Sequence, residues 1–286
     1  MSEQVVGVAQ MQHLLVRRLL AGNAGPFTYT GTQTYLVGGQ DVAVVDPGPA
    51  IAGHVDALVR AIGDSRVRAI VCTHTHRDHS PAAAELKERT GAPIIGCAPL
   101  VLDSSGPRAD ASFDTGYEPD EVMRDGDTIA GEGWTLQAVA TPGHTSNHLC
   151  YAVPEAGALF TGDHVMGWST TVVVPPDGDM ARYLESLERL MARDQDATYH
   201  PAHGDSIDRP QRFVRGLIGH RKQREGQIIR LLERQVADIP TMVGEMYAGV
   251  DKRLHNAAGL SVLAHLIDLE QRGIACRHHS EWSLAA

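Results

Sequence analysis

The densest group of chemically capable side chains in this sequence is His74-x-His76-x-Asp78-His79. Three imidazoles and one carboxylate within six residues are hard to explain as a structural feature. Neutral imidazole and carboxylate groups are common ligands of Zn²⁺. Alternate residues of an extended loop project to one side, whereas an adjacent pair splits direction. The segment can therefore serve two neighbouring metal ions.

Residues of the same chemical kind follow further along the chain. His144 stands in Thr-Pro-Gly-His-Thr, Asp163 follows Thr-Gly, and His203 stands in Pro-Ala-His-Gly. Each of them comes after a strand-like segment or a Pro/Gly turn. Together with the first cluster they make seven candidate ligands, which are enough for a pair of metals that share one carboxylate and one water.

Local patterns place the first cluster at the end of a strand. The β-branched run 67–72 leads directly into it, after a predicted hairpin over 34–37 and 42–45 and a helix over 51–62. A helix over 82–90 follows, with Ser80 as its predicted cap and Gly91 as its stop.

The alternation of strands and helices continues and predicts an α/β fold. Further strands are expected at 94–97, 134–139, 149–153 and 159–161, and a helix at 180–192 capped by Asp179. The segment 103–121 has no clear periodicity and is expected to form an irregular loop that borders the site.

Helical spacing dominates from about residue 209 onward. Helices are expected over 213–235, 241–248 and 260–271, followed by a short strand over 273–278. This pattern predicts a catalytic domain over 1–208 and a winged-helix-like domain over 209–286.

The order of these blocks resembles the metallo-β-lactamase superfamily. The segment 162–171, the Pro-Ala-His-Gly motif and the helix containing 220–225 resemble its lactamase-beta-2 group. This resemblance implies an αββα sandwich with a winged-helix-like C-terminal domain. It also implies two Zn²⁺ ions, although nitrogen and carboxylate ligands without cysteine suit iron or manganese as well. By the same resemblance one metal binds His74, His76 and His144, the other binds Asp78, His79 and His203, and Asp163 bridges them.

The resemblance and the metal chemistry favour a dinuclear hydrolase. A metal-bridged hydroxide would attack a small ester, lactone, thioester or lactam, with Asp78 as the catalytic residue that orients the nucleophile. His164, Ser169 and Thr170 directly follow the bridging Asp163 and are candidates for substrate binding. His148 and His200 are expected to have supporting or structural roles.

An endoribonuclease that cleaves single-stranded RNA is the alternative, because two metals also serve phosphodiester attack. Trp134 and Trp168 are then the candidate stacking residues. A net charge of −10 argues against general attraction of nucleic acid. The basic turn Arg221, Lys222 and Arg224 either grips an anionic substrate or forms a solvated helix face.

Partners and location follow from the same features. A DNA-binding tail is disfavoured, because the predicted helix over 260–271 carries Asp268 and Glu270 and no Lys or Arg before Arg272. A small-molecule substrate is expected, and RNA and a homodimer remain open. The C-terminal region is expected to mediate dimerisation or to form one wall of the active site. The beginning of the chain lacks an export pattern, so a cytoplasmic location without membrane contact is expected. The pair His278-His279 is expected in an exposed tail.

Overall fold

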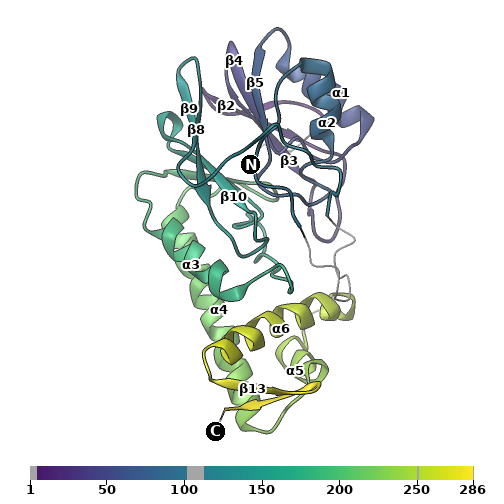
Figure 1. Cartoon of the computed structure of the whole chain (residues 1–286), viewed down its shortest axis with the longest axis vertical. Helices are drawn as coiled ribbons and strands as arrows, with labels where there is room; N and C mark the ends of the chain where they lie inside the picture. The colour runs from purple at the N-terminus through teal and green to yellow at the C-terminus, as the bar shows by residue number, and fades with distance from the viewer. Residues whose placement is uncertain (1–4, 102–112, 250, 286) are drawn as a thin grey trace. The chain divides into compact units, whose positions relative to one another are not determined.

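Figure 1 shows the computed structural model of the chain, which describes residues 5–101, 113–249 and 251–285. The described residues form two compact units. The first unit comprises the residues up to Thr141, Asn147–Thr171 and Arg193–Pro210. The second comprises Pro142–Ser146, Val172–Ala192 and the residues from Gln211 onward.

The first unit contains two five-stranded sheets. One has the order β1-β2-β3-β4-β5, with strands at Gln10–His13, Val16–Leu20, Gln33–Gly38, Asp41–Val45 and Arg66–Val71. The other has the order β12-β11-β10-β9-β8, with strands at Thr198–Pro201, Ala158–Gly162, Leu149–Val153, Trp134–Ala140 and Thr128–Gly131. The unit also contains β6 (Ile95–Gly96), β7 (Glu121–Val122) and the short 3₁₀ helix η1 (Pro154–Ala156).

Both sheets contribute side chains to one shared apolar core. Tyr35 of β3 packs against Phe160 of β11 with ring centroids 5.0 Å apart. Helices α1 (Ala52–Ile62) and α2 (Ala82–Thr90) lie beside the first sheet and add Leu58 and Leu86 to the same core (Figure 1). Burial of such a side chain contributes about 1.5–3 kcal/mol, so this core fixes the strand ends firmly.

The predicted elements around the histidine cluster are confirmed, with one exception. Strands β3 and β4 form the expected antiparallel hairpin, and Gly91 ends α2 in a left-handed conformation with φ 71°. The exception is Ser80, which does not cap α2, because Pro81 occupies that position without a side-chain cap. The Ser80 hydroxyl instead donates a hydrogen bond to Asp114 at 2.7 Å.

The irregular loop predicted over 103–121 is described only in part, since residues 102–112 lie outside the described residues. Its described part does border the histidine cluster. Phe113 forms a β-bridge with His76, and the Asp114 amide donates a hydrogen bond to the Thr75 carbonyl at 2.8 Å. This end of the loop therefore packs directly against the candidate ligands.

The second unit is mainly helical. Its helices are α3 (Met180–Met191), α4 (Pro210–Glu233), α5 (Ile239–Met246), η2 (Lys252–Leu254) and α6 (His255–Gln271). The Asp179 carboxylate accepts a hydrogen bond from the Arg182 amide at 3.0 Å, which confirms the predicted cap of α3. Ile228, Leu266 and Trp282 belong to the apolar core that α4, α5, α6 and the terminal strands share.

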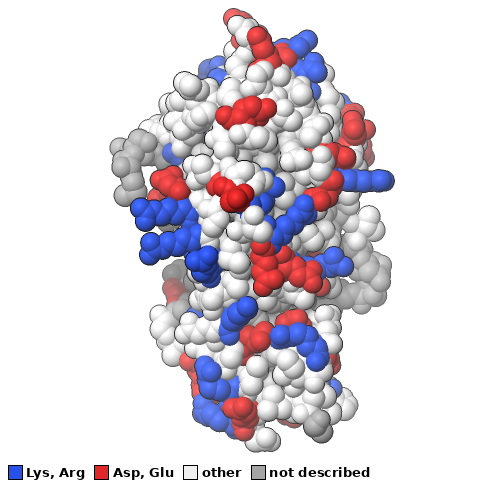
Figure 2. Space-filling model, turned by 90° about the vertical axis from the view of Figure 1, so that its left-hand side faces the viewer, with Lys and Arg blue, Asp and Glu red and all other residues white. Residues whose placement is uncertain are grey.

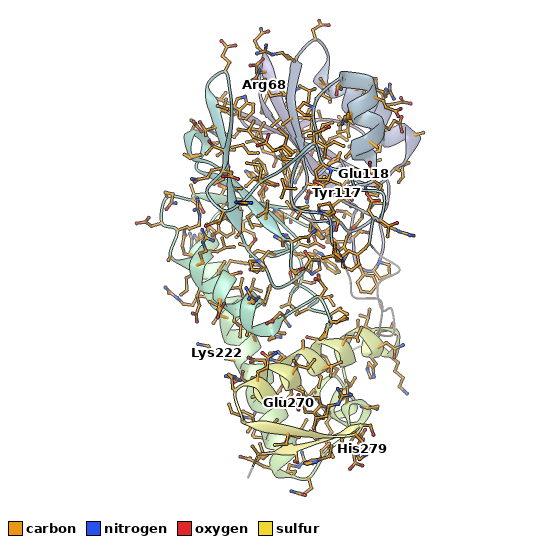
Figure 3. All side chains as sticks on the ribbon, viewed as in Figure 1. Arg68, Tyr117, Glu118, Lys222, Glu270 and His279 are labelled. Atoms are coloured by element: carbon orange, nitrogen blue, oxygen red, sulfur yellow. The ribbon has the colours of Figure 1, made fainter. Side chains whose placement is uncertain are left out.

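The end of the chain forms a hairpin rather than a single strand with a loose tail. Strand β13 (Ala275–His278) pairs antiparallel with β14 (Glu281–Leu284), which the sequence pattern did not reveal. His279, labelled in Figure 3, lies in the turn between them with φ 59°. The expectation that His278 and His279 belong to a tail is therefore wrong, although both side chains are exposed.

The observed architecture confirms the predicted fold class, a mixed α/β domain with two sheets and a helical winged-helix region. The two compact units interleave along the chain, so a single boundary between residues 208 and 209 stays a prediction. No helix in the described part of the chain is long and apolar enough to cross a membrane.

Candidate metal centre

Candidate ligands lie at the ends of three strands of the first unit. His74 follows β5, Asp163 follows β11 and His203 follows β12. Strand β11 runs parallel to β12, which brings the ends of these two strands to the same edge. The Leu149 amide bonds to the Thr73 carbonyl at 2.8 Å, and the Gln33 amide bonds to the Ala202 carbonyl at 2.8 Å. These hydrogen bonds join the two sheets at the level of the ligands.

Gly162 allows Asp163 to approach the histidine loop. It has φ 50°, a conformation that residues with a side chain rarely adopt. A Cβ atom at this position would lie 2.6 Å from the Thr73 hydroxyl oxygen and 2.7 Å from His148 Nε2. Only glycine therefore fits at the last position of β11, directly before the bridging candidate Asp163.

The first set of candidate ligands in this unit consists of His74, His76 and Asp163. Their ligand-capable atoms lie within 4.8 Å of one another. His74 Nε2 and His76 Nδ1 are 2.9 Å apart, so the two rings present nitrogen atoms toward a common point. His74 is fully buried and Asp163 is 9% exposed.

The second set consists of Asp78, His79 and His203, whose ligand-capable atoms also lie within 4.8 Å of one another. His203 Nε2 is 3.2 Å from Asp78 Oδ2 and 3.2 Å from Asp163 Oδ1. His79 Nε2 is 3.6 Å from the same two oxygens. Asp163 thus faces both sets, which is the position that a bridging carboxylate needs.

Hydrogen bonds on the far side of each ring fix its orientation. His79 Nδ1 lies 3.0 Å from Asp46 Oδ2, and His203 Nδ1 lies 3.3 Å from the Gly31 carbonyl oxygen. Histidines that bind metals usually use their second nitrogen in this way, which aims the other nitrogen at the metal.

Asp46 contacts the candidate ligand His79, and the sequence reasoning missed it. Its segment, Asp-Pro-Gly-Pro, indicated only a turn. In the structure the buried Asp46 carboxylate contacts His79 and also accepts hydrogen bonds from the Thr73 amide at 2.7 Å and the Thr73 hydroxyl at 2.8 Å. Asp46 has φ 50°, a strained backbone conformation of the kind found at functional sites. The sequence does not reveal this conformation.

The charges of the second set support one another. Burial opposes ionisation of Asp78, but the neighbouring His79 and His203 hold its pKa at about 2. Burial also opposes protonation of His79, yet the carboxylates of Asp78, Asp163 and Asp46 hold its pKa well above the ordinary value. The site therefore favours positive charge at its centre.

The described residues fit a bound cation. His79 Nε2 and His203 Nε2 are buried and make no hydrogen bond with the described part of the chain. Both nitrogens face the carboxylates of Asp78 and Asp163 at 3.2 or 3.6 Å, and a metal ion bound among these groups would give both atoms a ligand role. Imidazole and carboxylate ligands together suit a divalent cation such as zinc, iron or manganese.

The remaining candidate ligand and the supporting histidines have these surroundings. His144 belongs to Pro142–Ser146, and its Nδ1 lies 2.7 Å from the Val172 carbonyl oxygen within the second unit. His148 lies with its Nδ1 2.9 Å from the Thr141 hydroxyl, and its ring stacks 5.2 Å from His74. His200 is buried against Tyr35, and burial lowers its pKa to about 4.

The candidate substrate residues differ in their exposure. His164 is fully buried, whereas Ser169 and Thr170 are partly exposed. The Ser169 hydroxyl donates a hydrogen bond to the Thr170 carbonyl at 3.1 Å. Their roles in substrate binding stay predictions.

The basic turn of α4 matches neither of its two predicted roles as a whole. Arg221 is buried within the second unit, where its guanidinium lies 5.2 Å from the Tyr183 ring and 3.2 Å from the Ser261 hydroxyl. Arg224 lies over the Tyr247 ring at 4.5 Å. Of these three residues only Lys222, labelled in Figure 3, is exposed. The two arginines therefore pack inside this unit and do not form a solvated face.

Comparisons with known proteins agree with this geometry. Residues 28–203 match the metallo-beta-lactamase superfamily model, and residues 239–282 match the beta-lactamase associated winged helix domain. A beta-lactamase-like protein 2 homolog of Caenorhabditis elegans is 33% identical over 93% of this chain and 88% of its own length. The solved structure of a beta-lactamase domain protein from Burkholderia ambifaria superposes with a TM-score of 0.80 at 20% identity, covering 99% of this chain and 95% of that one.

A further relative is described as a thioesterase. The atrochrysone carboxyl ACP thioesterase of Paecilomyces divaricatus is 32% identical over 77% of this chain and 65% of its own length. The superfamily model spans more than half of the sequence, and the winged-helix model covers the C-terminal region. The chain belongs to the metallo-β-lactamase superfamily and is a hydrolase of that superfamily with a C-terminal winged helix.

Proposed function

We propose that the protein is a dinuclear metal-dependent hydrolase whose substrate is a small thioester. The observation that carries the proposal is the placement of Asp163 between two sets of candidate ligands. Asp163 belongs to the set with His74 and His76, and its Oδ1 lies 3.2 Å from His203 Nε2 of the other set. A single ion would leave one of the two sets without a ligand role.

Each residue then has a defined role. His74 and His76 hold one cation together with His144, whose loop is joined at both ends, through Thr141 and Asn147, to the first unit. Asp78, His79 and His203 hold the other cation. Two bound divalent cations, with zinc as the first candidate, would lower the pKa of water and polarise the substrate carbonyl.

Asp78 is the proposed catalytic residue. Its side chain is 27% exposed, unlike the fully buried His79, so it can contact a water molecule that enters from solvent. Its low pKa keeps it ionised and able to accept a hydrogen bond from that water. Hydrolysis joins the water oxygen to the carbonyl carbon and breaks the C–S bond, which yields a carboxylate, a thiol and a proton that is released to solvent.

A thioester is favoured over the other carbonyl substrates by the relative described as an ACP thioesterase. Single-stranded RNA receives less support. Trp134, one of the two predicted stacking residues, is 2% exposed and donates its indole N–H to the Asp41 carbonyl. Basic and acidic side chains are interspersed on the face shown in Figure 2, which suits a phosphate backbone poorly. RNA, a homodimer and a cytoplasmic location stay predictions.

The test is turnover of an S-acetyl-N-acetylcysteamine thioester by protein loaded with zinc, iron or manganese. Asp163→Ala should lower kcat/KM roughly 10³-fold, because cations supply several kcal/mol of transition-state stabilisation. His278→Ala, an exposed histidine of β13, is the matched control and should stay within about twofold. Turnover that survives Asp163→Ala would contradict the proposal, as would cleavage of single-stranded RNA without thioester turnover.

A further inference from the structure

Three exposed aromatic side chains stand out in the first unit. All Phe, Tyr and Trp residues of the chain lie in the described part, and among them only Phe27, Tyr29 and Trp168 are exposed. Tyr29 and Trp168 stack with ring centroids 4.9 Å apart and an interplanar angle of 11°. They keep 49% and 37% of their surface exposed. Such a pair presents a flat apolar surface to solvent.

The backbone holds Tyr29 in a strained conformation. Tyr29 has φ 56°, which is rare for a bulky side chain. Two reciprocal hydrogen bonds between the backbones of Gly25 and Tyr29, at 2.8 and 3.2 Å, close this turn. Strain of this kind persists where the surrounding structure enforces it and is concentrated at functional sites.

The segments that carry Tyr29 and Trp168 contact His203 of the candidate metal centre through their backbones. The carbonyl oxygen of Gly31, two residues after Tyr29, lies 3.3 Å from His203 Nδ1. The amide of Gly167, directly before Trp168, donates a hydrogen bond to the His203 carbonyl at 2.9 Å. A Cβ atom on Gly204 would lie 3.0 Å from Trp168 Cβ. The aromatic pair therefore lies beside His203, at the edge of the candidate site.

We propose that Tyr29 and Trp168 form an acyl-binding platform that selects thioesters with a planar, unsaturated acyl group. This inference rests on the proposed thioesterase function and adds the substrate class. Aromatic rings prefer parallel-offset or edge contacts with other planar groups, so the exposed ring surface would bind a planar acyl chain better than a short saturated one. Phe27, on the same turn as Tyr29, adds apolar surface there.

An RNA base is the other planar ligand that could stack here. Binding of an RNA strand would also require a basic groove along its phosphates. Asp205 and Asp208 follow His203 in the adjoining segment, and the chain has a net charge of −10. These carboxylates favour an uncharged acyl group over a polyanion.

The first experiment compares benzoyl and acetyl thioesters of N-acetylcysteamine on the metal-loaded protein. The ratio of their kcat/KM values should fall about tenfold in Trp168→Ala and in Tyr29→Asn, since asparagine tolerates the left-handed backbone. Trp168→Phe should restore most of the ratio. Leu14→Ala, which removes an 88% exposed side chain elsewhere in the first unit, is the control and should leave the ratio unchanged. An unchanged ratio in Trp168→Ala would overturn the platform.

The second experiment measures binding to metal-free protein, so that its result does not depend on turnover. Trp134 and Trp282 are only 2% and 3% exposed, so an external ligand should quench mainly Trp168. S-benzyl-N-acetylcysteamine should quench wild-type fluorescence with a Kd about tenfold lower than the S-methyl analogue, and Trp168→Phe should lose this signal. Quenching with no thioester turnover would sink the thioesterase proposal alone. Equal affinities, or quenching only by an RNA octamer, would sink the platform.

Discussion

Each unit of the molecule buries a histidine with at least one ring nitrogen that makes no hydrogen bond with the described residues, but the charges around these two histidines are opposite. In the first unit, His79 faces the carboxylates of Asp78, Asp163 and Asp46, and its pKa is raised despite burial. In the second unit, burial and the nearby Arg221 lower the pKa of His265 to about 3. A buried imidazole alone therefore does not identify a metal ligand, whereas convergence with carboxylates does.

Among the changes that test this contrast between His79 and His265, Asp46→Asn should have the largest effect, which is on metal affinity. The substitution removes the charge that faces His79 Nδ1 and weakens the alignment of Nε2. We expect metal affinity to fall by about 10–100-fold, the usual cost of losing an orienting partner of a ligand histidine. Competition with a chelator of known affinity measures this change.

A purely structural role for Asp46 would give a different result. The melting temperature of the metal-free protein would then fall while metal affinity stayed the same. Asp41→Asn serves as the matched control, because Asp41 lies at the other end of β4, which Asp46 follows, and pairs with the exposed Arg66 at 2.8 Å. This control should keep metal affinity within about twofold, since exposed ion pairs contribute little.

A smaller effect, on the free energy of unfolding, is expected when pH changes the charge of His265. Its folded pKa of about 3 lies below the ordinary 6.5, so the unfolded chain binds a proton first as pH falls. The stability that neutral His265 contributes is thus present above pH 6.5 and is lost toward pH 3. Between pH 8 and pH 5 the loss is about 2 kcal/mol.

Denaturant unfolding followed through the buried Trp282 measures this loss in the second unit. His265→Leu should show a weaker pH dependence than the wild type by about 2 kcal/mol over the same range. Identical slopes for the two proteins would show that burial and the nearby arginines do not lower the pKa of His265 in the folded protein.

The sequence predicted the candidate ligands better than it predicted their support. His74, His76, Asp78 and His79 were recognisable because they lie within one short segment after a strand. Asp46 acts on Thr73 from 27 residues away, so its role depends on the pairing of β4 with β5. No local pattern contains that information.

Local sequence patterns also predicted the C-terminal helices without predicting their contacts. Helical spacing predicted α4 and α6, but it could not tell which face of α4 would meet another element. Arg221 reaches Ser261 across 40 residues and is buried, whereas its neighbour Lys222 is exposed. The terminal hairpin was missed in part because Glu281–Leu284 is only four residues long.

Metal counting tests the central claim most directly. Inductively coupled plasma mass spectrometry of the purified, zinc-loaded wild type should give two ions per chain. The control His278→Ala should give the same number. His74→Ala and His203→Ala remove ligands from different sets and should each retain about one ion. One ion in the wild type, or loss of both ions in one variant and of neither in the other, would contradict a dinuclear site shared through Asp163.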